Sequence, residues 1–208
     1  SSAIPSGSAH DGNSAAMIKR LVSSSPGKAS LNTTSYSTPI YTVDSSVARV
    51  RVDYDSCGGA PGDPEWLTRQ WNAQFASVPV PAGARGASGE DSEIAIWSPS
   101  TDELWELWRF RKTPSGYSAC WGGKISNASS SNGVHTYPFG VSASGLSLMG
   151  GTVRAEELKA GSINHAIAIG INAPRAGVMS WPANRSDGTS NDQNAIPEGT
   201  RLRLDPSL

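Results

Sequence analysis

Two carboxylates and one imidazole are the candidate catalytic side chains, because each lies in or next to a strand-like run of the sequence. Asp91 precedes a strand-like run, Glu106 lies in the middle of ELWELWRFR, and His165 lies in the apolar run INHAIAIGI. Glycoside hydrolysis needs one protonated and one ionised carboxyl group, about 5 to 9.5 Å apart. We therefore predict that Asp91 and Glu106 form a catalytic pair, and that His165 holds one of them in its working protonation state.

Aromatic and cationic side chains near this pair are suited to binding a sugar. Indole rings present a flat apolar face to a sugar ring, and guanidinium groups bind its polar substituents. The predicted substrate-binding residues are Trp97, Trp108, Trp121, Tyr137, Arg109 and Arg185. The sequence thus favours a polysaccharide or oligosaccharide as the partner, cleaved by a glycoside hydrolase.

Two other chemistries remain open. His165 as base and Tyr137 as acid would suit a polysaccharide lyase, which eliminates across a uronate. A carbohydrate-binding module or lectin would use the same tryptophans without cleaving the polymer. A purely structural role is the simpler alternative for the acids, because Asp91 can cap a hairpin and Glu106 can pair with a neighbouring arginine. A histidine on an apolar strand, such as His165, is also more often structural than catalytic.

Metal and cofactor sites are not expected. The three histidines, His10, His135 and His165, lack the spacing of metal ligands. The oxygen-rich run SDGTSND at residues 186–192 lacks the full calcium-loop pattern. No G-x-S-x-G segment marks a serine hydrolase.

A hairpin is expected to position the catalytic pair. Strand-like runs at residues 93–97 and 103–111 are joined by SPSTD, in which proline favours a turn. The period of two puts Leu104, Glu106, Trp108 and Phe110 on one face of the second strand. Each face carries both indole and charge, which indicates one face in the core and one in an aromatic groove.

The remaining elements follow from periodicity and turn residues. Helices are predicted at residues 64–75 and 154–160, with Asp63 as an N-cap and Gly161 as a C-cap, and residues 15–22 are predicted to be helical or irregular. Strands are predicted at residues 38–43, 47–54, 116–125, 163–171 and 200–204. The run at 163–171 is the most apolar of these, so we expect it to be central.

Composition agrees with an all-β class. The chain has 208 residues, a hydrophobic fraction of 37%, 22 glycines and 14 prolines, which implies many turns and short elements. We predict an antiparallel β-sandwich of the jelly-roll, concanavalin A-like type with one or two short accessory helices. A flexible leader at residues 1–14 would precede a single domain at 15–208.

Charge and cysteine content narrow the partners and the compartment. A net charge of −1 provides no long-range electrostatic attraction for nucleic acid, and no apolar run is long enough to span a membrane. We expect a monomer. Cys57 and Cys120 allow one internal bridge, and the polar, serine-rich start is typical of an exported protein, so we favour a disulfide over two thiols.

Several segments of the second half carry a resemblance. GLSLMGG, GSINHAIAI, WPANRSDG and AIPEGTRLRL, preceded by WELWR, resemble a set of secreted, mainly actinobacterial proteins. In that set GLPLLGG-like, G-x-I-x-H-A-L, P-A-x-R and P-x-G-x-R-x-R-L segments recur from the Asp91 region to the C-terminus. The resemblance implies export and a shared site without naming a reaction. The recurring polar positions are Asp91, Glu106, Glu157, His165, Arg185, Arg201 and Arg203.

Overall fold

The computed structural model of the chain describes residues 4–5, 7–25, 29–58 and 64–204. Its strands all fall between residues 40 and 126, and its helices are short. In chain order the elements are α1 (Ser14–Ser24), β1 (Ile40–Thr42), β2 (Val52–Tyr54), α2 (Glu65–Phe75), β3 (Ile94–Ser98), β4 (Glu103–Trp108), β5 (Arg111–Thr113), β6 (Gly116–Ala119), β7 (Trp121–Ser126), the 3-10 turn η1 (Ala128–Ser130), α3 (Leu148–Gly151) and α4 (Ala155–Ala160).

The predicted hairpin forms the middle of a four-stranded sheet of order β1-β3-β4-β7. β3 and β4 are antiparallel, with Ala95 opposite Glu106, and β7 pairs antiparallel with the other edge of β4. β1 is parallel to β3, because a long crossover separates the two in the chain. The sheet is therefore mixed rather than antiparallel, and a jelly-roll order is not confirmed.

A second, three-stranded sheet shares a core with the first. Its order is β2-β6-β5, with β2 parallel to β6 and β5 antiparallel to it. Both sheets and α2 contribute apolar side chains to the main core, among them Val52, Trp71, Phe75, Ile96 and Trp105, all with at most 1% exposure. Two mixed sheets around one core, with a few short helices, agree with the predicted β class.

The helix α2 confirms the prediction for residues 64–75. Leu67, Trp71 and Phe75 recur at helical spacing and face the core. The buried indole of Trp71 donates to the carbonyl of Val52 at 2.9 Å, which ties the helix to β2. Pro64 is the N-cap residue and not the first helical residue, and Asp63 lies outside the described residues.

The opposite face of the four-stranded sheet has a smaller core of its own. Ala95, Leu104 and Ile125 are buried there, and Trp97 and Met149 pack against them. Met149 belongs to α3, so this core places the segment before and within α3 against β4. Glu106 lies on this same face of β4, since it follows Leu104 by two residues.

The predicted strand at residues 103–111 ends early, because the backbone turns at Arg109. Arg109 has φ +51°, a left-handed conformation that is uncommon outside glycine, asparagine and aspartate. Beyond it, Phe110 enters the main core and stacks on Tyr117 at 5.4 Å between ring centroids. The expectation that Trp108 and Phe110 share a face is therefore wrong.

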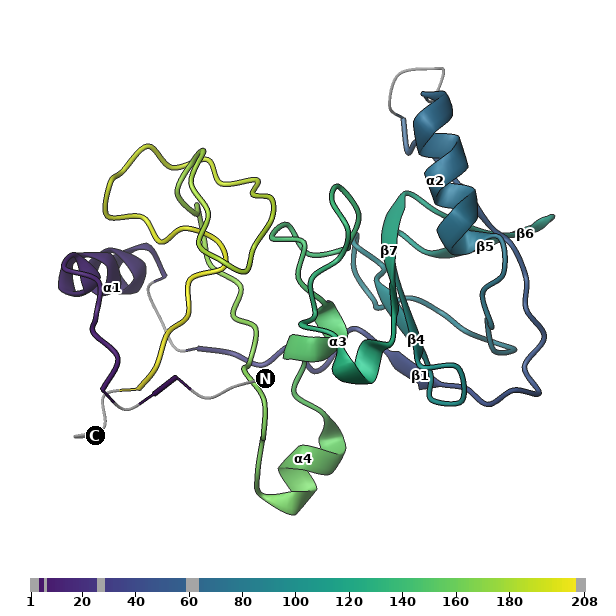
Figure 1. Cartoon of the computed structure of the whole chain (residues 1–208), viewed down its shortest axis with the longest axis horizontal. Helices are drawn as coiled ribbons and strands as arrows, with labels where there is room; N and C mark the ends of the chain where they lie inside the picture. Colours follow the sequence, from purple (N-terminus) through teal and green to yellow (C-terminus); the bar gives the residue numbers. More distant parts are fainter. Residues whose placement is uncertain (1–3, 6, 26–28, 59–63, 205–208) are drawn as a thin grey trace.

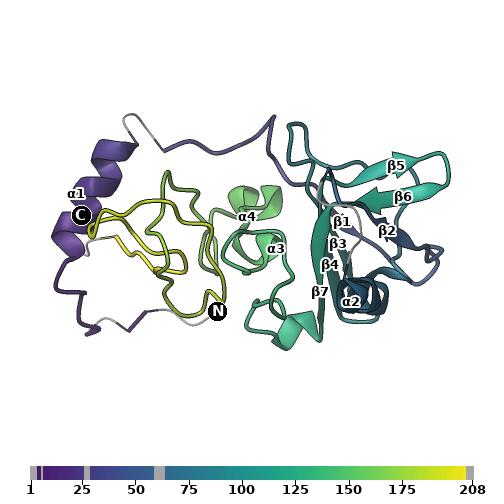
Figure 2. The same cartoon turned by 90° about the horizontal axis from the view of Figure 1, so that it is seen from above.

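The C-terminal part differs most from the sequence-based expectation. No strand forms at residues 163–171 or 200–204, and Ile167 and Ile169 are exposed. The helix α4 is as predicted and ends at Gly161 with φ +69°. Figures 1 and 2 show the segment beyond α4 as loops lying beside α1 and away from the sheets, with α3 and α4 between. Ion pairing of Arg20 with Asp192 at 2.9 Å joins α1 to these loops.

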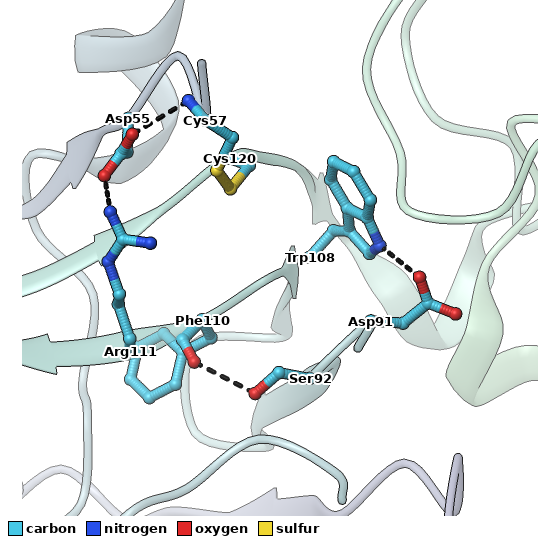
Figure 3. Close-up of a disulfide and its surroundings, with 8 residues drawn as sticks. All are labelled: Asp55, Cys57, Asp91, Ser92, Trp108, Phe110, Arg111 and Cys120. Atoms are coloured by element: carbon cyan, nitrogen blue, oxygen red, sulfur yellow. Dashed lines mark hydrogen bonds and ion pairs between the residues drawn. A yellow bond between two sulfur atoms is a disulfide. The ribbon is translucent and has the colours of Figure 1, made fainter. Parts of the chain in front are cut away.

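The predicted disulfide is confirmed. Cys57 and Cys120 are bonded, with 5.6 Å between their Cα atoms, and join the chain just after β2 to the residue between β6 and β7. Figure 3 shows Asp55 beside the bridge, where it pairs with Arg111 of β5 and accepts the amide of Cys57 at 2.8 Å. Such a bond is compatible with an extracellular location. Within the described part of the chain, no helix has the length and apolar character needed to cross a bilayer.

Candidate functional site

Glu106 lies in a sealed pocket of hydrogen-bond donors. Its side chain has no exposed surface, and it accepts bonds from His135 Nε2 at 2.9 Å, Ser147 Oγ at 2.7 Å and the amides of Leu148 and Met149 at 3.0 and 2.9 Å. Hydrogen bonds to a charged group contribute about 1.5–3 kcal/mol each, so four of them offset a burial penalty of several kcal/mol. Glu106 therefore anchors the loop before α3 to β4.

The pKa of Glu106 and the packing around its partner His135 also indicate a structural role. Burial raises the pKa of Glu106, but the bonds from His135, Ser147 and the Met149 amide lower it by more. The pKa therefore lies below the ordinary value. The imidazole of His135 is buried against Gly123 of β7 and Gly140, and a Cβ on Gly123 would overlap the ring. A substrate has no path to this carboxylate, which is the reverse of what the predicted catalytic role requires.

Asp91 lies at the start of the hairpin, against Trp108. Its Oδ1 accepts the indole N–H of Trp108 at 2.8 Å, as Figure 3 shows, and its carbonyl oxygen accepts the amide of Arg109 at 2.7 Å. The guanidinium of Arg109 lies over the Trp108 ring, 4.5 Å from the centroid. Asp91 is partly exposed. The structure thus joins three predicted site residues, Asp91, Trp108 and Arg109.

Glu93 is a second carboxyl group at this place that the sequence analysis did not select. Its Oε2 is buried and has no hydrogen-bond partner within the described chain. Burial raises the pKa of Glu93; a bond from its own backbone amide opposes the shift, and the nearby charge of Asp91 raises the pKa further. Carboxyl groups with raised pKa values beside an ionised neighbour are frequent in catalytic sites. The D-x-E spacing of residues 91–93 was the available sequence signal.

The backbone around the two acids is strained. Ser92, between them, has φ +40°, and Arg109 on the partner strand has φ +51°. The two strained segments are bonded to each other, since the amide of Phe110 donates to the carbonyl of Ser92 at 3.1 Å and the Ser92 hydroxyl to the carbonyl of Phe110 at 3.2 Å. Residues held in such conformations cluster at functional sites. We call Asp91, Glu93, Trp108 and Arg109 the hairpin-end cluster.

His165 lies elsewhere, beside α4. Its Nδ1 is 2.8 Å from the carbonyl of Ala166, and its Nε2 is 3.0 Å from Glu157 Oε1, an ion-pair distance without hydrogen-bond alignment. Side-chain and backbone bonds from Arg154 lower the pKa of Glu157 to about 2, partial burial opposes the shift, and His165 adds to it. Both ring nitrogens of His165 thus face protein oxygens, an arrangement that does not favour a catalytic base.

An open depression of about 350 Å³ lies next to this ion pair. Its lining residues are Arg154, Glu156, Glu157, Ala160, Ser162 and Asn164. No contact among the described residues joins His165 to Asp91 or Glu106. The structure therefore does not bring the three predicted catalytic residues into one trough.

The other predicted binding residues are mostly engaged with protein. Trp97 packs in the smaller core, while Trp121 stacks on Phe139 at 5.3 Å and donates to the carbonyl of Pro138 at 3.3 Å. Arg185 donates to the carbonyls of residues 138, 140 and 142, which fastens their loop, and burial lowers its pKa. Tyr137 is 66% exposed.

Metal ligands and known relatives give no further guide to the site. The described residues contain no group of three or more His, Cys, Asp or Glu side chains placed to hold a metal ion. Comparison with protein-family models, curated proteins and solved structures finds no match for this chain. The resemblance to secreted bacterial proteins stays a prediction, although Glu157 and His165, both at its recurring positions, lie side by side.

Proposed function

We propose that this protein is an exported glycoside hydrolase that cleaves a polysaccharide at the hairpin-end cluster. The observation that supports it most is the unequal pair of acids: Glu93, with a buried, unpartnered oxygen and a raised pKa, beside Asp91, which is held by an indole N–H. Retaining and inverting glycosidases both need one protonated and one ionised carboxyl group.

The roles follow from the surroundings. Glu93, whose pKa is raised by burial, acts as the acid that donates a proton to the departing glycosidic oxygen. Asp91, fixed by the indole N–H of Trp108, acts on the sugar as nucleophile or as base toward water. Trp108 fixes the Asp91 carboxylate and offers indole surface next to it, and Arg109 contributes a positive charge with no acidic partner among the described residues. In this proposal Glu93 replaces Glu106 as the second acid.

Export is part of the same proposal. The Cys57–Cys120 bond would persist in an oxidising compartment, where extracellular polysaccharides are also found.

Reducing-end release from a panel of plant and bacterial polysaccharides tests the proposal. The wild type, Asp91→Asn, Glu93→Gln and the neighbouring control Glu90→Gln are compared, since Glu90 is exposed and has no part in the cluster. We expect Asp91→Asn and Glu93→Gln to lower the rate by about 100-fold or more, and Glu90→Gln to leave it unchanged. Equal rates in all four proteins, or an unsaturated product absorbing in the ultraviolet, would contradict hydrolysis by this pair.

A further inference from the structure

Trp181 is the most exposed tryptophan of the described chain. It is 75% exposed, compared with 42% for Trp66 on the outer face of α2. An indole in water leaves a large apolar surface unburied. Trp181 lies in the C-terminal loops, which Figure 2 shows beside α1, with α3 and α4 between these loops and the strands β3 and β4.

The turn that carries Trp181 is fastened on both sides. The amide of Ser180 donates to the carbonyl of Glu198 at 2.7 Å, and the amide of Ala183 donates to the carbonyl of Ser180 at 2.9 Å. The hydroxyls of Ser180 and Thr200 are 3.1 Å apart. Gly199 allows this close approach, because its φ is +82° and a Cβ there would overlap the Ser180 carbonyl. Trp181 is therefore presented by a preorganised turn.

A cation lies over the exposed ring. The guanidinium of Arg201 is 5.8 Å from the centroid of the Trp181 ring and has no acidic partner among the described residues. A flat aromatic face with an adjacent guanidinium is suited to a sugar ring that stacks on the indole and carries a carboxylate. A fixed turn reduces the entropy that binding would otherwise cost.

We propose that Trp181 and Arg201 form a second carbohydrate-binding site, specific for polysaccharides that carry carboxylate groups. The site holds the polymer to the protein and does not take part in cleavage. It does not rest on the proposed activity of Asp91 and Glu93, because both of its residues belong to the C-terminal loops.

Affinity electrophoresis through gels that contain polygalacturonate or alginate tests this site without measuring turnover. The wild type should be retarded, and Trp181→Ala should weaken that binding by about tenfold or more, as loss of a central aromatic contact does. The matched control is Trp66→Ala, which removes another exposed indole and should bind as the wild type does. Retardation is measured without turnover, so failure of the hydrolase proposal is seen separately.

The role of Arg201 is tested by removing its charge from the protein or the carboxylate charge from the polymer. Arg201→Gln should lose retardation by polygalacturonate, and the wild type should bind the fully methyl-esterified polymer more weakly than the acid form. The inference is overturned if the wild type is not retarded by either acidic polymer, or if Trp181→Ala binds like the wild type. It is also overturned if Trp66→Ala is equally impaired, or if Trp181→Ala loses binding to anionic phospholipid vesicles and not to polysaccharide.

Discussion

Glu93, Glu106 and Glu157 have the same side chain but different surroundings. Glu93 has a buried oxygen without a partner, and its pKa is raised. Glu106 is fully buried among four donors, and Glu157 is bonded to Arg154; both have lowered pKa values. A carboxyl group that is held ionised by its neighbours stabilises a fold, whereas one that keeps a proton near a second acid is equipped for acid catalysis.

The sequence identified Glu106 as special but not its role. Leu104 and Trp108 flank it at the period of two, which agrees with its burial, and burial alone raises the pKa of a carboxyl group. The partners that reverse the shift, His135 and Ser147, are 29 and 41 residues away in the chain. Local spacing cannot reveal donors that only the folded loop brings to the carboxylate.

Glu106→Gln is expected to destabilise the protein by about 3 kcal/mol, because it leaves His135 without its charged partner and places an amide group opposite other donors. Urea unfolding at neutral pH measures this. The control on the same strand is Glu103→Gln, whose solvent-accessible pairs with Arg49 and Lys124 should cost about 1 kcal/mol or less. Equal losses in the two variants would contradict a structural role for Glu106.

The stabilising effect of Glu106 should also depend on pH. Its folded pKa lies below the ordinary value of 4.5, so its contribution is present above about pH 4.5 and is lost as the pH falls through the folded pKa. The unfolding free energy of the wild type should therefore decrease more steeply below that pH than that of Glu106→Gln. Parallel curves for the two proteins would show that the carboxylate is not held ionised by the fold.

The pKa of Glu157 can be measured directly. Carboxyl carbon NMR should give a pKa of about 2 for Glu157 in the wild type, and Arg154→Ala should raise it toward 4.5, because Arg154 makes the largest contribution to the shift. His165→Gln is the comparison and should raise the pKa less. A value near 4.5 in the wild type would contradict the ion pairs beside α4.

At the scale of elements, local patterns predicted most of the strands and helices but not their partners. The hairpin of β3 and β4, the helix α2 and the C-cap of α4 follow from alternation, helical spacing and glycine placement. The parallel pairing of β1 with β3 and of β2 with β6 depends on segments far apart in the chain. The apolar run at 163–171 has strand-like alternation, but in the structure it has no neighbouring strand and stays irregular.

Gly123 of β7 is expected to be essential for packing β7 against the loop that carries His135. Gly123→Ala would place a Cβ against the imidazole and 2.8 Å from the amide nitrogen of Gly140, so we expect a loss of about 1–3 kcal/mol. Urea unfolding checks this against Gly170→Ala, where a Cβ meets no neighbour and the change should be within about 0.5 kcal/mol. If Gly123→Ala is as stable as Gly170→Ala, the packing described for His135 is wrong.

At the scale of the whole molecule, the disulfide closes a large loop. Cys57 and Cys120 are separated by 63 residues, and a loop of that length corresponds to about 4 kcal/mol of unfolded-state entropy. Reduction of the wild type should therefore lower its urea midpoint clearly. The double variant Cys57→Ser/Cys120→Ser should start at that lower midpoint and not respond to reductant. An unchanged midpoint on reduction of the wild type would contradict the bridge.

The β class and the disulfide were predictable from composition and cysteine count, since both depend on whole-chain properties. The convergence of Asp91, Glu106 and His165 was not, because each is held by a different part of the molecule: the hairpin end, the loop before α3 and the start of the C-terminal loops. What remains of the predicted site is the Asp91, Trp108 and Arg109 group, now with Glu93.

The assignment of Glu93, and not Glu106, as the second acid is decided by the turnover of Glu93→Gln and Glu106→Gln on the same polysaccharide, at a temperature where both variants are folded. Circular dichroism establishes that both variants are folded in the assay. We expect Glu93→Gln to lower reducing-end release by about 100-fold or more, while Glu106→Gln, although less stable, keeps a rate close to that of the wild type. Loss of cleavage in Glu106→Gln with full activity in Glu93→Gln would show that Glu93 is not the second acid.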